Sequence, residues 1–116
     1  MSQSDELEFI GHIYDEVKFI LKTTQSIDAD SFYKDELLKR AVTRAFEIIG
    51  EATKNLDFEF RNKYPHIPWK FMAGMRDKLI HEYMGVDYKL VFKTAKEEIP
   101  ELKFQMEQIL EEHNNK

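Results

Sequence analysis

The segment RDKLIHEYMGVD, residues 76–87, places a permanent cation, an imidazole and a phenol at the spacing R-x(4)-H-x-Y. Histidine titrates near neutral pH, so His81 can give or take a proton during a reaction. The guanidinium of Arg76 can bind a phosphate through two parallel hydrogen bonds. Asp77 is four residues before His81 and shares its helical face, so it could hold the imidazole in one tautomer. An Arg–His pair is also common on inert surfaces, so it does not define a function alone.

Cleavage of RNA is one reaction that these groups could perform. It needs a base for the 2′-hydroxyl, an acid for the leaving oxygen and positive charge near the phosphorane. Two copies of Arg76 and His81 across a dimer axis would supply all three without a metal. Tyr83 has three interpretations: a core residue with a paired hydroxyl, a contact to substrate phosphate, or a nucleophile that accepts a transferred group. Arg76 and Tyr83 lie on nearly the same line of a helix, because two turns separate them.

Other chemistries find little support. The chain has no cysteine, which excludes disulfides, thiol catalysis and cysteine-ligated metals. The segment HEYMG lacks the second histidine of H-E-x-x-H, and the other histidines show no ligand spacing, so we expect neither a metal nor a cofactor. No apolar stretch approaches the roughly 20 residues of a membrane span, and the N-terminus is acidic, unlike a secretory signal. We therefore expect a cytoplasmic protein without a membrane partner.

The charge distribution is uneven. The 116 residues carry a net charge of -5, which argues against a nucleic-acid-binding protein. Residues 61–80, however, contain only one acidic residue, Asp77, and five cations. The cations are Arg61, Lys63, Lys70, Arg76 and Lys78. Ordinary scatter of surface charge explains this cluster as well as a basic patch does. If it is a patch, Lys70 and Lys78 are candidates for substrate binding.

The length and the 42% hydrophobic content indicate a single globular domain over residues 1–116, with 113–116 expected to fray. Apolar periodicity and capping residues predict helices at 5–23, 32–56, 69–84 and 88–98, the last restarting at Pro100 and running to about 112. The second helix has a possible break near Lys34, and Gly85 is the expected stop of the third. No strand pattern is visible. The prediction is an all-α, antiparallel, up-and-down bundle of four to five helices.

The helix at 69–84 has two apolar sides. Its core face comprises Met72, Met75, Leu79 and Tyr83, and Arg76 lies at the edge of that face. Lys70, Gly74, Asp77 and His81 lie on the opposite side. A second apolar row is formed by Ala73, Ile80 and Met84.

We interpret the second row as a homodimer interface that passes near Gly74, Ile80 and Met84. This arrangement would bring His81 of both copies near one groove. In the alternative, the row packs against the helix at 88–98 of the same chain.

The sequence also resembles a known family. Arg76, Asp77, His81 and Tyr83 are similar to the R-x(4)-H-x-Y motif of HEPN-domain proteins, which usually has a polar residue after the arginine. The segments EIIGEATKNL, FRNKYPHIPWKFMAGMRDKLIHEYMGVD and IPELKFQMEQIL resemble HepT toxins, the small HEPN subfamily paired with MNT-type nucleotidyltransferases. The likeness covers most of residues 5–112 and is most specific in 46–87.

The resemblance implies a HEPN-like helical dimer with the motif in a cleft between subunits. It implies a metal-independent endoribonuclease in which Arg76 and His81 are catalytic and Asp77 supports them. It further implies a toxin–antitoxin pair whose nucleotidyltransferase uses ATP to transfer AMP to Tyr83. The added bulk and negative charge would then block RNA.

Two details of the resemblance concern carboxylates. Glu47 or Glu51 should be structural, in a buried pair with an arginine such as Arg76 or Arg44. Relatives often have asparagine where this chain has Asp77, so repulsion of the scissile phosphate should weaken cleavage here.

Two other functions remain open from the sequence. The chain could be a non-catalytic module that docks a nucleotidyltransferase and presents a nucleotide or phosphate to it. It could also be an interaction bundle without any chemistry, in which case loss of Arg76 would change neither RNA cleavage nor modification.

Overall fold

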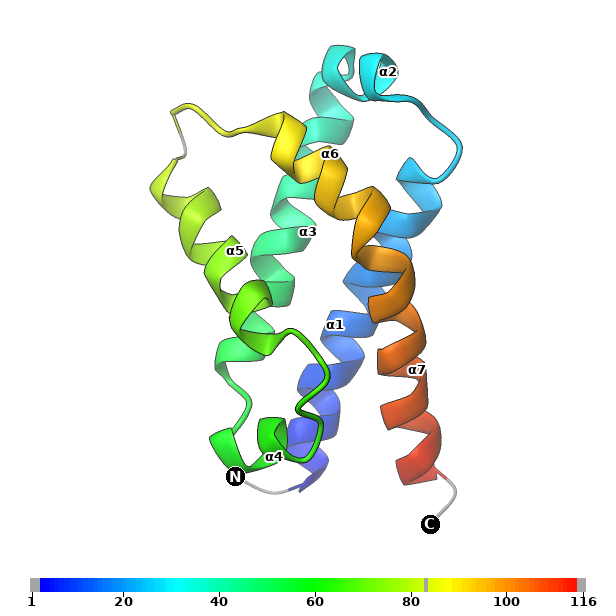
Figure 1. Ribbon diagram of the computed structural model, residues 1–116, viewed down its shortest axis with the longest axis vertical. Coiled ribbons are helices and arrows are strands. Elements are labelled where there is room, and N and C mark those ends of the chain that lie inside the picture. Colours follow the sequence, from blue (N-terminus) through cyan, green and yellow to red (C-terminus); the bar gives the residue numbers. More distant parts are fainter. Residues whose placement is uncertain (1–2, 83, 115–116) are drawn as a thin grey trace.

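The computed structural model describes residues 3–82 and 84–114, and this part of the chain contains helices and no strands (Figure 1). Four long segments run alternately up and down along the 45 Å axis. They are α1 (Gln3–Thr24), α3 (Glu36–Lys54), α5 (Trp69–His81), and α6 (Tyr88–Glu97) followed by α7 (Ile99–Asn114). The short helices α2 (Ala29–Lys34) and α4 (Phe58–Asn62) lie in the connections. The all-α bundle is confirmed, but the described residues form seven helices instead of four to five.

Aspartates fix where three of the helices begin. Asp28 accepts a hydrogen bond from the Ser31 amide at 2.8 Å and caps α2. The break expected near Lys34 occurs at Asp35, which accepts from the Leu38 amide at 2.9 Å and caps α3. Asp87 caps α6 as predicted, at 3.1 Å from the Leu90 amide. Each carboxylate satisfies an amide that has no partner within its helix.

The end of α5 differs from the prediction. The helix ends at His81, and the Gly85 amide donates to the Glu82 carbonyl at 2.8 Å in the turn that follows. No glycine of the described chain has a positive φ, so Gly85 does not end the helix in the left-handed conformation expected of it. Farther on, Pro100 lies in the first turn of α7, where its missing amide is not needed. Helix α7 continues to Asn114, past the expected start of fraying at 113.

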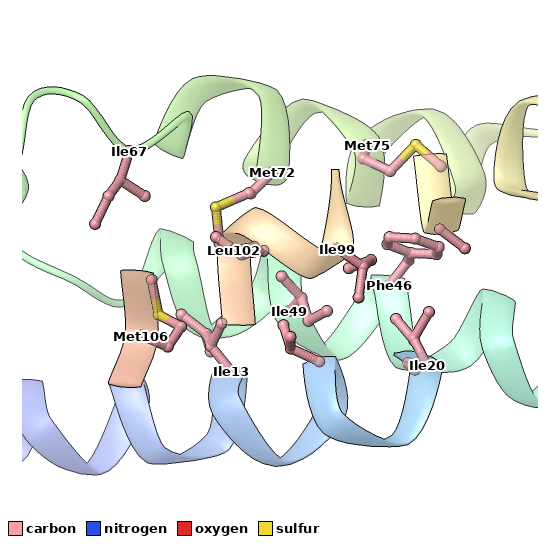
Figure 2. Packing of buried hydrophobic residues seen from close by; sticks show 14 of the residues in the cluster. Ile13, Ile20, Phe46, Ile49, Ile67, Met72, Met75, Ile99, Leu102 and Met106 are labelled. Atoms are coloured by element: carbon pink, nitrogen blue, oxygen red, sulfur yellow. The ribbon is translucent and has the colours of Figure 1, made fainter. Parts of the chain in front are cut away.

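The core lies between α3 and its neighbours, since α3 packs against α1 and α5, and α1 also packs against α7. Figure 2 shows apolar side chains from these helices meeting in one cluster, among them Ile13, Ile49, Met72, Ile99 and Met106. The predicted core face of α5 is confirmed for Met72, Met75 and Leu79, which are all buried. Tyr83 lies outside the described residues. None of the helices described here is long and apolar enough to span a lipid bilayer.

Candidate functional site

The site begins where α5 crosses α3 at Gly50. A Cβ atom built on Gly50 would lie 2.1 Å from the Cβ of Arg76 and 2.8 Å from the carbonyl oxygen of Met72. Both distances are too short for any side chain, and both atoms belong to α5 at or next to its backbone. Only glycine therefore allows the two helices to approach this closely, and this approach sets the stem of Arg76 directly against α3.

Two carboxylates orient the guanidinium of Arg76. Its Nε lies 3.1 Å from Glu51 Oε2 on α3, and its Nη1 lies 3.1 Å from Asp77 Oδ1. The side chain of Arg76 is 30% exposed, so the guanidinium is fixed in direction yet within reach of solvent.

Both carboxylates that were expected to pair with arginines do so, since Arg44 Nη1 also lies 3.3 Å from Glu47 Oε1. The expectation of a buried pair is wrong, however, because Glu51 is 56% exposed and Arg44 is largely exposed. Water screens such pairs, so they contribute little to stability. The main effect of the Glu51 pair is to hold the Arg76 guanidinium in place.

A second cation converges on the same carboxylate. Lys54, in the last turn of α3, bonds through Nζ to Asp77 Oδ1, the oxygen that also accepts from Arg76 Nη1. The hydrogen bond from Lys54, and next that from Arg76, lower the pKa of Asp77 below its ordinary value. Asp77 is thus an anion held between two cations. A phosphate oxygen carries the same charge and would suit the same two donors.

Asp77 does not make the contact that was expected of it. In the part of the chain described, His81 has no hydrogen bond to Asp77, although both lie on the outer face of α5. The ammonium of Lys54 and the guanidinium of Arg76 hold the carboxylate instead. In this chain Asp77 therefore orients Arg76, and the imidazole of His81 remains unengaged by it.

His81 is the last residue of α5 and is exposed. Together with Arg76, Asp77 and Ile80 it lines an open pocket of about 320 Å³. The pocket therefore combines a group that can transfer protons with a cation that can bind phosphate, five residues apart on α5. A polyanion can reach both from solvent.

The second apolar row predicted for residues 69–84 is exposed at two of its three positions, one of which, Met84, lies in the turn after α5. Ile80 is 43% exposed and Met84 is 87% exposed. The alternative in which α6 of the same chain buries this row is therefore wrong. An uncovered apolar strip next to the pocket is a common mark of a contact surface.

Neither of the two lysines that we predicted to bind substrate, Lys70 and Lys78, lines the pocket at His81. Lys78 Nζ is 3.0 Å from Oε1 of Glu82, the residue that follows α5. Lys70 is exposed at the start of α5 and lines a different pocket.

Sequence reasoning overlooked Lys54, the lysine that does reach the site, where it bonds to Asp77. The spacing of Glu47, Glu51 and Lys54 was a usable signal, because residues three and four apart form one polar face on α3, beside Gly50.

Within residues 3–82 and 84–114, no three His, Asp or Glu side chains come close enough together to hold a metal ion. Asp77, which lines the pocket, and Glu51, which contacts Arg76, are both paired with cations of the protein.

Comparison with known proteins gives consistent results. The family model described as "Ribonuclease HepT-like" matches residues 13–109. "Putative RNase TTE0752" of Caldanaerobacter subterraneus subsp. tengcongensis is 50% identical over 89% of this chain and 92% of its own length. "Putative RNase MJ0125" of Methanocaldococcus jannaschii is 45% identical over the full length of both chains. "Probable ribonuclease HepT" of Thermococcus cleftensis is 44% identical over 88% of this chain and 93% of its own. No solved structure matches significantly.

Proposed function

The chain belongs to the HepT-like ribonuclease family, and on that premise we propose that it is a metal-independent endoribonuclease with Arg76 and His81 as its catalytic residues. One imidazole removes the proton of a 2′-hydroxyl, and the resulting oxygen attacks the adjacent phosphorus. The bond from phosphorus to the 5′ oxygen breaks, and a second imidazole gives that oxygen a proton. The products are a 2′,3′-cyclic phosphate and a 5′-hydroxyl, and Arg76 neutralises charge on the phosphorane.

The observation that carries this proposal is the pair of cations on Asp77 beside the exposed His81. Arg76 and Lys54 already bind one oxyanion at the pocket, so a phosphate of RNA can take the same donors. The same carboxylate repels an incoming phosphate, so this copy should cleave more weakly than relatives with asparagine at position 77. Asp77 supports catalysis by orienting the guanidinium.

A homodimer supplies the second imidazole. The mechanism needs one imidazole as the base and another as the acid. A single chain has only one His81, so it lacks one of these two groups. The exposed row comprises Ile80, which precedes His81 on α5 and lines the pocket, and Met84, which lies in the turn after the helix. If this row pairs with itself across a two-fold axis, the two pockets face each other.

Cleavage of single-stranded RNA by the purified chain tests the proposal. We expect cleavage to persist in excess chelator, because no step uses a metal, and the products to carry 2′,3′-cyclic phosphate ends. Electrophoresis before and after phosphatase treatment identifies those ends. Activity that appears only after magnesium is added, or products with 3′-hydroxyl ends, would contradict the mechanism.

We further propose that the chain is the toxin of a toxin–antitoxin pair and is silenced by AMP transfer to Tyr83. A cognate MNT-type nucleotidyltransferase would use ATP, and the hydroxyl of Tyr83 would displace pyrophosphate from it to form a phosphodiester with AMP. Tyr83 is two residues beyond His81. The adenylyl group would therefore bring a negative charge and a bulky base close to the pocket.

Intact-mass spectrometry tests the modification. We expect the chain to gain the mass of one or more adenylyl groups when it is expressed with its nucleotidyltransferase, and to lose cleavage activity with it. Tyr83→Phe should stay unmodified and active, because it lacks the accepting oxygen. A Tyr83→Phe protein that still gains this mass would place the acceptor elsewhere in the chain.

A further inference from the structure

A second pocket, of about 330 Å³, lies at the junction of α4 and α5. Its walls include two aromatic residues, Phe58 and Trp69, and two cations, Arg61 and Lys70. Phe58 opens α4 and is 71% exposed, an unusual position for a large apolar ring. Nothing in the mechanism proposed for Arg76 and His81 uses this pocket.

The wall of this pocket is held in place by hydrogen bonds. The indole Nε1 of Trp69 donates to the carbonyl oxygens of Arg61 at 3.1 Å and of Tyr64 at 3.0 Å. These bonds tie the start of α5 to the end of α4 and to the connection between them. A ligand would therefore meet a preformed surface and would not need to order a loop.

The cations of this pocket lack counter-charges within the protein. Over residues 3–82 and 84–114, neither Arg61 nor Lys70 forms an ion pair, and the buried Nε of Arg61 has no hydrogen-bond partner. The lining residues include no carboxylate. In contrast, Arg76 and Lys54 are both paired with acids. The pocket is therefore complementary to an anion that also carries an apolar or aromatic group.

One face of α5 connects this pocket with the pocket at His81. Lys70, Gly74, Asp77 and His81 follow one another at helical spacing on the outer side of the helix. A Cβ at Gly74 would meet no atom within 4 Å, so this part of the face is flat and open. The charge of Asp77 is balanced by Lys54 and Arg76. Lys70 and His81 are separated by about 16 Å along the helix axis.

We propose that the α4–α5 pocket binds a nucleotide of single-stranded RNA at a fixed distance from the scissile phosphate. The base stacks on Phe58, and its phosphates pair with Arg61 and Lys70. Stacking requires a base that is free of a duplex, so the ligand is an unpaired strand. The separation from His81 corresponds to at most about five stacked nucleotides at about 3.4 Å each. This assignment rests on the proposed ribonuclease function.

Fluorescence of Trp69, the single tryptophan of the chain, reports binding directly. The probe is a 2′-O-methyl RNA of about ten nucleotides, within the range of single-strand site sizes, which cannot be cleaved because its 2′ oxygens are blocked. We expect it to change the emission, with Kd about tenfold higher in Phe58→Ala, since stacking of one base contributes on that scale. Phe104→Ala, which removes an exposed ring from α7, should keep the wild-type Kd.

The salt dependence provides a second measurement. Loss of one phosphate contact in Lys70→Ala should make the slope of log K against log salt concentration shallower by about 0.7. Lys93→Ala removes an exposed cation from α6 and should leave the slope unchanged. Equal Kd and equal slope in all four variants, with circular dichroism showing each one folded, would overturn the assignment.

Cleavage assays separate this inference from the proposed function. We expect the ratio of kcat/KM for a ten-nucleotide RNA to kcat/KM for an RNA dinucleotide to fall about tenfold in Phe58→Ala. The ratio should not change in Phe104→Ala. If wild-type protein cleaves both substrates and the ratio is the same in Phe58→Ala, the RNA subsite is wrong and the ribonuclease assignment survives. If wild-type protein cleaves neither substrate, the proposed ribonuclease function is wrong, and with it the RNA subsite that rests on it.

Discussion

Replacement of His81 by alanine should lower the rate of RNA cleavage by about 10²–10⁴-fold, the range expected for the loss of a general acid or base. The side chain is exposed at the end of α5, so its removal leaves no cavity. We therefore expect the thermal unfolding midpoint to stay close to that of the wild type. Single-turnover cleavage of a labelled RNA, with calorimetry on the same sample, measures both quantities.

His12→Ala is the matched control for this prediction. His12 is also an exposed helical histidine, but it lies on α1 beside Glu8 and contributes to no part of the proposed site. Its removal should leave the cleavage rate unchanged. The mechanism also requires two copies of His81, so sedimentation should show a dimer at the concentrations where the protein is active. An active monomer, or a His81→Ala protein with the wild-type rate, would contradict the proposed mechanism.

Gly50→Ala should lower the free energy of unfolding by about 1–3 kcal/mol, the range for forcing an extra methyl group into a packed interface. The new Cβ would clash with the Cβ of Arg76 and the carbonyl oxygen of Met72, so α5 has to move away from α3. At roughly 4 °C per kcal/mol, the melting temperature should fall by about 4–12 °C. Cleavage should also slow by up to about 10²-fold, because the guanidinium of Arg76 moves away from its productive position.

Gly11→Ala tests whether the effect comes from the crossing of the helices. Gly11 lies inside α1, and a Cβ there would meet no atom within 4 Å. Alanine at this position should stabilise the protein by about 0.5–1 kcal/mol, since glycine is a poor residue for a helix interior. If Gly50→Ala behaves like Gly11→Ala in calorimetry and in RNA cleavage, the close approach at Gly50 does not position Arg76.

The sequence alone determined the secondary structure to a large extent. Local signals act over three or four residues, so a carboxylate such as Asp87 and the ring of Pro100 decide where a helix begins or restarts wherever the rest of the chain lies. The buried face of α5 was equally predictable for Met72, Met75 and Leu79, because a helix repeats its environment every 3.6 residues. The end of α5 was predicted less well. The helix ends at His81, and Gly85 does not adopt the positive φ for which a glycine would be needed there.

The positions of the site residues depended on the tertiary structure. The sequence left open whether Glu47 or Glu51 would pair with Arg76, and the crossing of α3 and α5 at Gly50 selected Glu51. The same crossing brings Lys54 to Asp77, although the two are far apart in sequence. Asp77 and His81 share a face by periodicity, yet the carboxylate accepts hydrogen bonds from two cations, Lys54 and Arg76. Periodicity places a side chain on a face, but its partner depends on which helix packs against that face and how closely.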